Sequence, residues 1–302
     1  MKKIYYITAV FATLFLVGCG DGIDLPGVNV ETDLNKIPLP DNNVNLEQVE
    51  LKPSTEPMLH EGLHTEEDFQ RIRDKKAAGE EPWVSAYQLL VESQFSQKTA
   101  DTYPTEWIKR GISGDENYMN AARGATIVYQ QALRWKIEQD DEYAAKAVEN
   151  LNKWVQTCVG VTGNTNLSLA AGLYGYEFAI AGELLRDYGG WDRADFAAFQ
   201  NWLLKVFYPA NDDFLKRHHD TNALHYWANW CLCNIAAKMA IGIVTDRRDI
   251  YNEGIAHLQT GDTNGRLRRA IYHDYAPDYN FAQWQESGRD QGHTLMLSLI
   301  HI

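Results

Sequence analysis

The chain contains little cysteine: four residues in 302, of which Cys158, Cys231 and Cys233 lie beyond the N-terminal segment. Cys231 and Cys233 are two positions apart in an apolar run with helical spacing, so their thiols point to different sides of the expected helix. This arrangement favours buried free thiols over a metal site. Acids and histidines at the close spacing of a dedicated zinc or calcium site are also missing. We therefore expect no metal and no cofactor, and the run His218-His-Asp220 is the one place considered for a captured ion.

Positive charge is also scarce. The chain has 28 Lys and Arg against 41 Asp and Glu, a formal net charge of −13. A nucleic-acid partner is therefore excluded, because such proteins neutralise phosphates with clustered cations. The charge also argues against a polyanionic substrate, unless cations gather in one cleft. Nine Trp and sixteen Tyr are a generous supply of rings; most are expected in the core, and exposed ones are typical of carbohydrate sites.

Signals for β-hairpins are absent, since no alternating apolar–polar runs flanked by Asn-Gly or Asp-Gly occur. From residue 60 onward apolar residues recur at helical spacing. The pattern predicts an all-α fold of antiparallel helix pairs, either an (α/α) toroid or a solenoid, and the lack of a fixed repeat disfavours a regular array. The expected helices cover about 65–78, 83–93, 117–139, 141–158, 167–188, 192–208, 222–244, 246–259 and 266–271, with a last one from about 288 onward.

The N-terminus has the features of a bacterial lipoprotein signal. Lys2 and Lys3 precede a short apolar stretch, and Leu16-Val17-Gly18-Cys19 resembles a lipobox. We expect a signal peptide over 1–18, lipidation of Cys19 with a flexible tether over 19–55, and a domain of about 245 residues over 56–302. This predicts a lipid-anchored protein of the cell envelope, in the periplasm or at the outer membrane. Because Ile302 ends an apolar helical run without a stop signal, we expect that the toroid is incomplete at its C-terminal end.

Two runs concentrate bases, cations, amides and aromatic rings: His225-Tyr-Trp-Ala-Asn-Trp230 and Glu286-Ser-Gly-Arg-Asp-Gln-Gly-His293. This chemistry suits an acidic sugar polymer, because rings stack on sugars while cations and amides bind carboxylates. The predicted partner is an acidic polysaccharide; the oligomeric state is left open.

These two runs and three further segments resemble those of a known family. The chain resembles the alginate-lyase-like superfamily of polysaccharide lyases, with glucuronan and alginate lyases nearest. The other segments are Gly62-Leu-His-Thr-Glu-Glu-Asp-Phe69, Ala171-Gly-Leu-Tyr-Gly-Tyr-Glu-Phe-Ala179 with Gly182-Glu-Leu-Leu-Arg186, and Met239-Ala-Ile-Gly-Ile243. The resemblance implies an α/α toroid and β-elimination at a uronic acid, with a late Tyr as acid/base and an earlier His or Asn.

The late tyrosines are Tyr272, Tyr275 and Tyr279. Tyr279 is favoured as the acid/base because it lies nearest the second run, whereas Tyr272 is expected to pack on a short helix. A Tyr base needs a nearby cation to lower its pKa, which is about 10 in a model peptide.

His225 and Asn229 are four apart, which places them on one face of the helix expected over 222–244. We predict that they contact the uronate carboxylate, with Tyr226 or Trp230 forming a wall of the site. The chain departs here from the superfamily, which often has Asn-His or Asn-Asn just ahead of the aromatic pair. The His role is therefore open, and His218 or His219 in the preceding loop are the alternatives.

Arg289 and His293 are expected one turn apart on the last helix, where Arg289 grips a uronate or lowers the pKa of the Tyr. An ion pair of Glu286 with Arg289, without a catalytic role, is the alternative. The remaining predicted substrate contacts are Gln283, Glu286, Asn164 and Asn166.

Two other functions stay open. An inverting glycoside hydrolase on a similar toroid would need two separated acids, for which Asp290 and Glu183 are candidates. A non-catalytic glycan-binding lipoprotein would tolerate loss of Tyr279 or His225. The sequence does not choose among alginate, glucuronan and a glycosaminoglycan.

Overall fold

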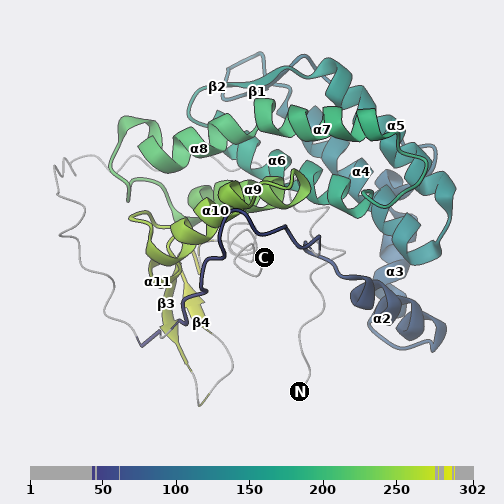
Figure 1. Ribbon diagram of the computed structural model, residues 1–302, viewed down its shortest axis with the longest axis horizontal. Coiled ribbons are helices and arrows are strands. Elements are labelled where there is room, and N and C mark those ends of the chain that lie inside the picture. The colour runs from purple at the N-terminus through teal and green to yellow at the C-terminus, as the bar shows by residue number, and fades with distance from the viewer. Residues whose placement is uncertain are drawn as a thin grey trace.

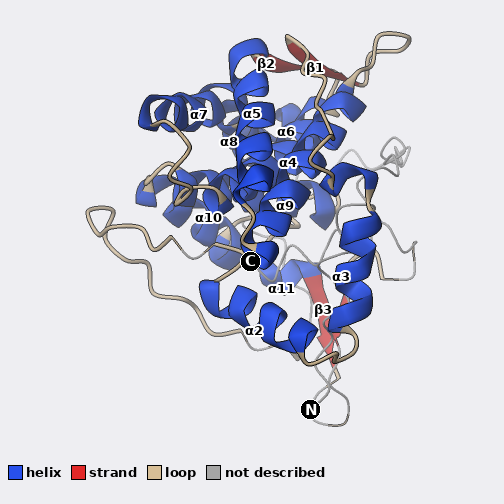
Figure 2. Ribbon diagram, turned by 90° about the vertical axis from the view of Figure 1, so that its right-hand side faces the viewer, coloured by secondary structure: helices blue, strands red, loops and turns tan. Residues whose placement is uncertain are grey.

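The computed structural model describes residues 43–44, 46–60, 62–275, 278, 282–287 and 289. This part of the chain is mostly helical, as the sequence predicts, with two small strand pairs at opposite ends of the molecule (Figures 1 and 2). No described helix is long and apolar enough to cross a membrane.

The helices are α2 (Glu66–Ala77), α3 (Trp83–Glu92), α4 (Tyr118–Glu138), α5 (Asp141–Thr157), α6 (Leu167–Leu184), α7 (Arg193–Val206), α8 (Tyr208–Arg217), α9 (Ala228–Val244), α10 (Arg248–Thr260) and α11 (Leu267–Ala270). Short 3-10 turns are η2 (Gln94–Ser96) and η3 (His218–Asp220). The strands are β1 (Trp107–Arg110), β2 (Gly160–Gly163), β3 (Ile271–Asp274) and β4 (Ala282–Trp284).

Helices α4, α6 and α9 form the buried centre of the fold. All of α9 and nearly all of α6 are buried, because both are apolar around their whole circumference. Each is followed by an antiparallel partner: Gly182 of α6, for example, meets Phe199 of α7, while Phe178 meets Trp202. The expected antiparallel helix pairs are therefore present, and the three central helices run parallel to one another.

Two short strand pairs accompany the helices, although the sequence carries no hairpin signal. β3 and β4 are antiparallel, with His273 opposite Gln283, whereas β1 and β2 pair in parallel. Each strand has only three or four residues, so none is long enough to show an alternating pattern. Tyr272 consequently lies on a strand and not on the short helix predicted for it.

Two helix boundaries also differ from the prediction. The helix expected over 192–208 ends at Val206, and α8 then begins at Tyr208 with Pro209 in its first turn, where the missing N–H is not needed. The helix predicted from 222 begins only at Ala228, because Asn222 accepts from the Leu224 N–H and forms a local turn. His225 and Asn229 therefore do not share a helix face: His225 lies in a loop and Asn229 in the first turn of α9.

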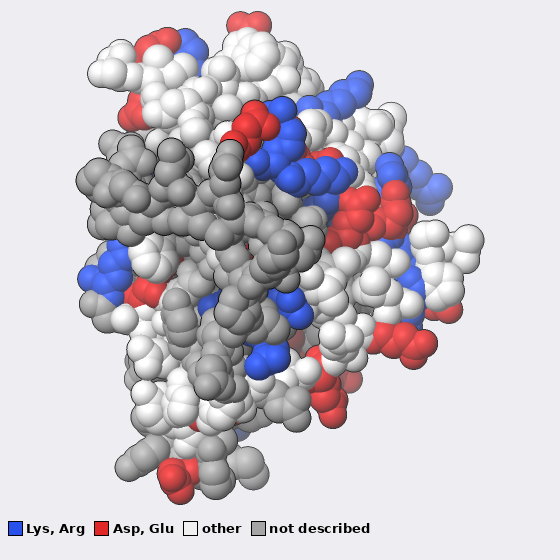
Figure 3. Space-filling model, turned by 90° about the vertical axis from the view of Figure 1, so that its left-hand side faces the viewer, with Lys and Arg blue, Asp and Glu red and all other residues white. Residues whose placement is uncertain are grey.

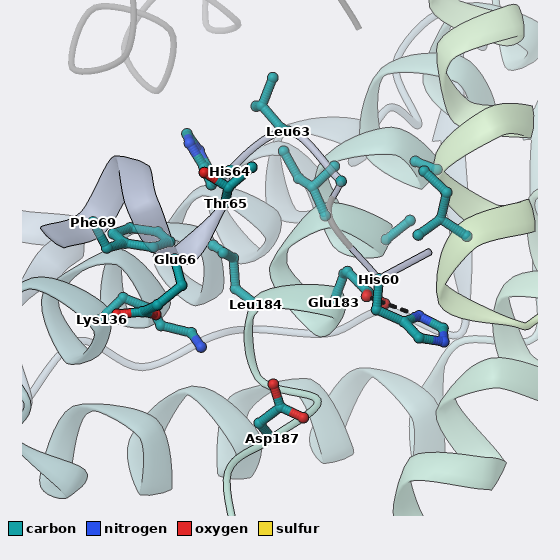
Figure 4. A pocket seen from close by; sticks show the side chains of 15 residues that line it. His60, Leu63, His64, Thr65, Glu66, Phe69, Lys136, Glu183, Leu184 and Asp187 are labelled. Carbon is teal, nitrogen blue, oxygen red and sulfur yellow. Dashed lines mark hydrogen bonds and ion pairs between the residues drawn. The ribbon is translucent and has the colours of Figure 1, made fainter. Parts of the chain in front are cut away.

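The described part of the predicted tether lies along α10 (Figure 1). The carbonyls of Val49, Lys52 and Glu56 accept hydrogen bonds from side chains of Gln259, Asn252 and Arg248. The segment leads to a hollow of about 290 Å³ at the C-terminal ends of α6 and α9 (Figure 4).

The contact between α6 and α9 depends on a small residue. A methyl group at Gly172 would lie 2.6 Å from Cys233 Sγ and 3.1 Å from the Asn234 backbone nitrogen. We expect Gly172→Ala to cost about 1–3 kcal/mol through overpacking, which lowers the melting temperature by roughly 2–4 °C per kcal/mol. Gly189→Ala is the control, because nothing lies within 4 Å of its added carbon. Equal melting temperatures for the two variants would contradict the close approach.

Glu177 is a buried acid between α4 and α6. Its Oε1 accepts from Thr126 Oγ1 at 3.0 Å, while Oε2 has no hydrogen-bond partner. Burial raises the pKa of Glu177 from 4.5 to about 8, so the folded protein keeps a proton that the unfolded chain loses. The contribution of Glu177 to the free energy of unfolding is therefore fully present below pH 4.5 and declines as the pH rises to about 8.

Replacing this acid with an amide should remove the decline. We expect Glu177→Gln to match the wild type near pH 4 and to exceed its unfolding free energy by a few kcal/mol at pH 8. Urea unfolding at both pH values measures the difference, with the exposed Glu106→Gln as control. A Glu177→Gln profile parallel to that of the wild type would refute the buried, protonated acid.

Candidate functional site

Several of the predicted residues, namely His218, His219, His225, Tyr226 and Trp230, lie around η3, at the N-terminal ends of α6 and α9. His218, His219 and Asp220 have φ angles of 47°, 53° and 60°, three consecutive non-glycine residues in the left-handed region. Such strain persists only where the surroundings impose it, and it is concentrated at functional sites.

His218 is the buried member of this turn. It is 2% exposed, packs against Phe214 with ring centres 4.7 Å apart, and places Nε2 3.5 Å from Cys231 Sγ. Burial lowers the pKa of His218 to about 4. A neutral, enclosed ring of this kind supports the turn and does not reach a polymer in solution.

His219 is only half-buried. Its Nε2 lies 3.1 Å from Ser168 Oγ of α6, and it has a hydrogen bond to the Thr165 backbone. Burial lowers the pKa of His219, against the opposing effect of Asp213. The ring is therefore neutral at pH 7 and is held in place from two sides.

Tyr226 is the centre of an aromatic cluster. Its ring lies 4.6 Å from Trp230, 4.9 Å from His225 and 5.7 Å from His219. Tyr226 and Trp230 are 8% and 6% exposed, so little of either ring is available to a sugar. The exposed ring of this segment is Trp227, at 41%, which spacing alone did not single out.

His225 and Asn229 have different surroundings. His225 is exposed, with its ring edge-on to Tyr226. Asn229 is 1% exposed, and its Oδ1 has no hydrogen-bond partner in the described structure. The two polar groups predicted to act together are thus one accessible base and one enclosed amide.

The loop that carries His225 and Tyr226 is fixed by two residues that sequence reasoning missed. Asn264 Nδ2 donates to the carbonyls of Leu224 and Tyr226 at 3.1 and 2.9 Å. Gln285 Nε2 donates to Asn264 Oδ1, and its Oε1 accepts from the Ala228 N–H at the start of α9. No local signal marks these residues, since they act 38 to 57 positions along the chain from their partners.

Asn164 and Asn166 lie in the loop between β2 and α6, beside the strained turn. Asn164 Oδ1 accepts from both the backbone N–H and the side-chain amide of Asn166, so these groups hold the loop itself. The loop contributes the Thr165 backbone that bonds His219.

Gln285, the residue before the second predicted run, bonds the first residue of α9, Ala228. Arg289 Nη1 and Glu286 Oε1 form an ion pair at 2.7 Å, which is the non-catalytic alternative for this pair. Gln283 Oε1 accepts from the Tyr275 hydroxyl at 3.4 Å. Tyr279, His293, Asp290 and Cys19 lie outside the described residues. In the part of the chain that the structure describes, no group of three or more His, Cys, Asp or Glu is arranged to hold a metal.

The class of protein follows from one comparison. A family model described as alginate lyase matches residues 72–270, well over half of the chain. The chain therefore belongs to the alginate lyase family, which supports a polysaccharide lyase acting on an acidic polysaccharide. No curated protein matches the chain.

Loss of the Asn264 amide should loosen the loop before α9. Asn264→Ala removes three hydrogen bonds worth about 1 kcal/mol each, two to the carbonyls of Leu224 and Tyr226 and one from Gln285. Hydrogen exchange of the amides in 222–230 should therefore become faster. Asn252→Ala is the control, because it removes a similar bond, to the Lys52 carbonyl, on α10. Unchanged exchange over 222–230 in Asn264→Ala would show that the loop is held by other contacts.

Proposed function

We propose that the protein cleaves a polyuronate, alginate or glucuronan, by β-elimination at the strained turn. The observation that carries this proposal is His219: a neutral, accessible imidazole, oriented by Ser168 and Thr165, within the family-matched region. The described helix pairs form part of an (α/α) toroid in this proposal.

The reaction removes the C5 proton of a uronic acid and then breaks the 4-O-glycosidic bond, leaving an unsaturated sugar. Its main requirement is stabilisation of the negative charge that develops on the adjacent carboxylate. His219 takes the role first expected of the exposed His225 and donates a hydrogen bond to this carboxylate, which replaces one of its present partners, Ser168 or the Thr165 backbone. The N-terminal ends of α6 and α9 lie at the same end of the molecule and add positive potential.

A tyrosine of the segment that follows β3 serves as acid/base. Tyr279 remains the first candidate, as in the prediction from sequence. Tyr275 is the second, because it is half-buried at the end of β3 with its hydroxyl on Gln283. Trp227 provides an exposed ring on which a sugar stacks.

The hydrolase alternative receives no support from Glu183. This acid is near the C-terminal end of α6, about 22 Å along the helix from Ser168 at a rise of 1.5 Å per residue. It lines the hollow in Figure 4, where it bonds His60 at 3.1 Å, and it pairs with Arg186 at 2.9 Å. An acid so far from His219 and so fully paired is not placed to work at the strained turn.

We also propose that lipid on Cys19 anchors the domain in the cell envelope, at the periplasmic side or on the outer membrane. The lipobox carries this proposal.

Elimination has its own optical signature, because the unsaturated uronate absorbs in the ultraviolet and a hydrolysis product does not. We expect absorbance to rise with alginate or glucuronan, and His219→Ala to lower kcat/KM by about 10²–10⁴-fold. Tyr279→Phe and Tyr275→Phe, tested separately, identify the acid/base. The control is Tyr103→Phe, a 75% exposed ring. New reducing ends without a rise in absorbance would establish a hydrolase. A wild type that produces neither signal would favour a binding protein.

A further inference from the structure

The two-stranded ribbon of β1 and β2 has a buried and an exposed face. Ile108 and Arg110 of β1 lie inside and are 0% and 5% exposed. Trp107 and Lys109 alternate with them, so their side chains lie on the outer face of the ribbon. Trp107 is 42% exposed, and the Lys109 side chain is 31% exposed. This outer face is therefore accessible to a ligand in the described structure.

The indole of Trp107 rests on the neighbouring strand. Trp107 pairs with Gly160 of β2, where an added methyl group would lie 2.5 Å from the ring atom Cζ3. The carbonyl oxygen of Trp107 accepts from Thr105 Oγ1 at 3.1 Å and from Asn117 Nδ2 at 3.0 Å. The sheet therefore supports the ring, while a large part of it stays exposed. A ring that is held in place before binding can stack on a sugar at little cost in conformational entropy.

Lys109 adds a cation to the same face, two residues from Trp107 and thus about 7 Å further along the strand. Its Nζ pairs with Asp115 at 2.7 Å, and the Asp115 side chain is 64% exposed. A pair of this exposure contributes little to stability and is screened by salt. A carboxylate of a bound polymer can therefore take the place of Asp115 at Lys109.

The ribbon continues into the loop that holds His219. β2 ends at Gly163, and the next two residues, Asn164 and Thr165, are exposed. The Thr165 backbone bonds His219. The chain from Gly160, the partner of the indole, to Thr165 spans at most about 17 Å in a strand conformation. A short oligosaccharide bridges this distance.

The position of the ribbon relative to this loop is fixed. Gly163 pairs with Arg110 at the end of β1, and the next residue, Gly111, leaves no room for a methyl group beside the Asn164 side chain. The outer face of the ribbon and the strained turn therefore keep one relative position, as two sites along a single polymer require.

Charge alone does not mark a path for an acidic polymer. The net charge of the chain is −13, and on the face in Figure 3 basic and acidic side chains are interspersed over the described surface. A polyuronate is therefore not attracted by a broad positive field and must be held by local contacts. An exposed ring beside an exposed ammonium supplies two such contacts, stacking and a charged hydrogen bond.

We propose that the outer face of the β1–β2 ribbon is a second binding surface for the acidic polysaccharide, on which a sugar ring stacks against Trp107 and a uronate carboxylate pairs with Lys109. This inference rests on the proposed function for its substrate class. The surface holds units of the polymer that lie several sugars away from the bond cleaved at the strained turn. It raises the affinity for long chains and takes no part in the chemistry.

Substrate length separates this surface from the strained turn. We expect Trp107→Leu and Lys109→Met each to raise the KM for a long polyuronate about tenfold, with kcat unchanged. A uronate trisaccharide cleaved at the strained turn is too short to reach Trp107, so its kcat and KM should stay as in the wild type. Lys75→Met is the matched control, since Lys75 pairs with Glu80 at 2.6 Å on α2 and is 38% exposed.

Two results would overturn the proposal. One is an unchanged KM of Trp107→Leu for the polymer. The other is an equal rise in KM for the polymer and the trisaccharide, because the substitution would then disturb the strained turn itself. Melting temperatures check that each variant is folded, and Lys109→Met decides the question if Trp107→Leu is unstable.

Binding without catalysis distinguishes this inference from the proposed function. In native gels that contain alginate or glucuronan, we expect the wild type and Lys75→Met to be slowed relative to a gel without polymer, and Trp107→Leu and Lys109→Met to be slowed less. A wild type that is slowed but produces no elimination would keep the surface and reject the proposed activity. No slowing of the wild type, or equal slowing of the wild type and Trp107→Leu, would reject the surface.

Discussion

The packing of α6 between its neighbours is the constraint on which the site depends. This helix is apolar on every side, so it must be covered by α4, α7, α8 and α9. Its glycines allow the neighbours to approach closely, as Gly172 does against Cys233 and Gly175 against Phe207. The same helix carries Ser168 in its first turn, against His219. Burial of α6 therefore positions one side of the proposed catalytic turn.

The long helices could be predicted because the helical spacing of apolar residues and the signals at helix ends are local features of the sequence. The segments expected over 117–139 and 141–158 are α4 and α5 to within one residue at each end. The errors occur where the local backbone conformation is determined by residues distant in the sequence. Asn264 holds the carbonyls of Leu224 and Tyr226, which keeps the backbone before α9 out of the helix. β3 and β4 pair although neither is long enough to show a strand pattern.

The candidate site was predictable as a set of residues and not as a set of roles. His218, His219, Tyr226 and Trp230 do lie together, as two short runs rich in bases and rings indicate. Burial then distinguishes them, and it follows from the tertiary fold. His218 is enclosed while His219 is reachable, and the accessible ring is Trp227 rather than its neighbours. Asn264 and Gln285 act only through long-range hydrogen bonds, so no motif reveals them.

Buried polar groups without a hydrogen-bond partner are accommodated in different ways in the described part of this fold. Glu177 is relieved by its own chemistry, because a raised pKa keeps the acid neutral between α4 and α6. Asn229 has no charge to lose, and one unpartnered amide oxygen is a modest penalty. For Arg110 the described structure provides the face of the Tyr118 ring, 4.7 Å from the guanidinium carbon. The fold therefore accommodates a buried polar group either by changing its protonation state, as at Glu177, or by packing it against a ring, as at Arg110.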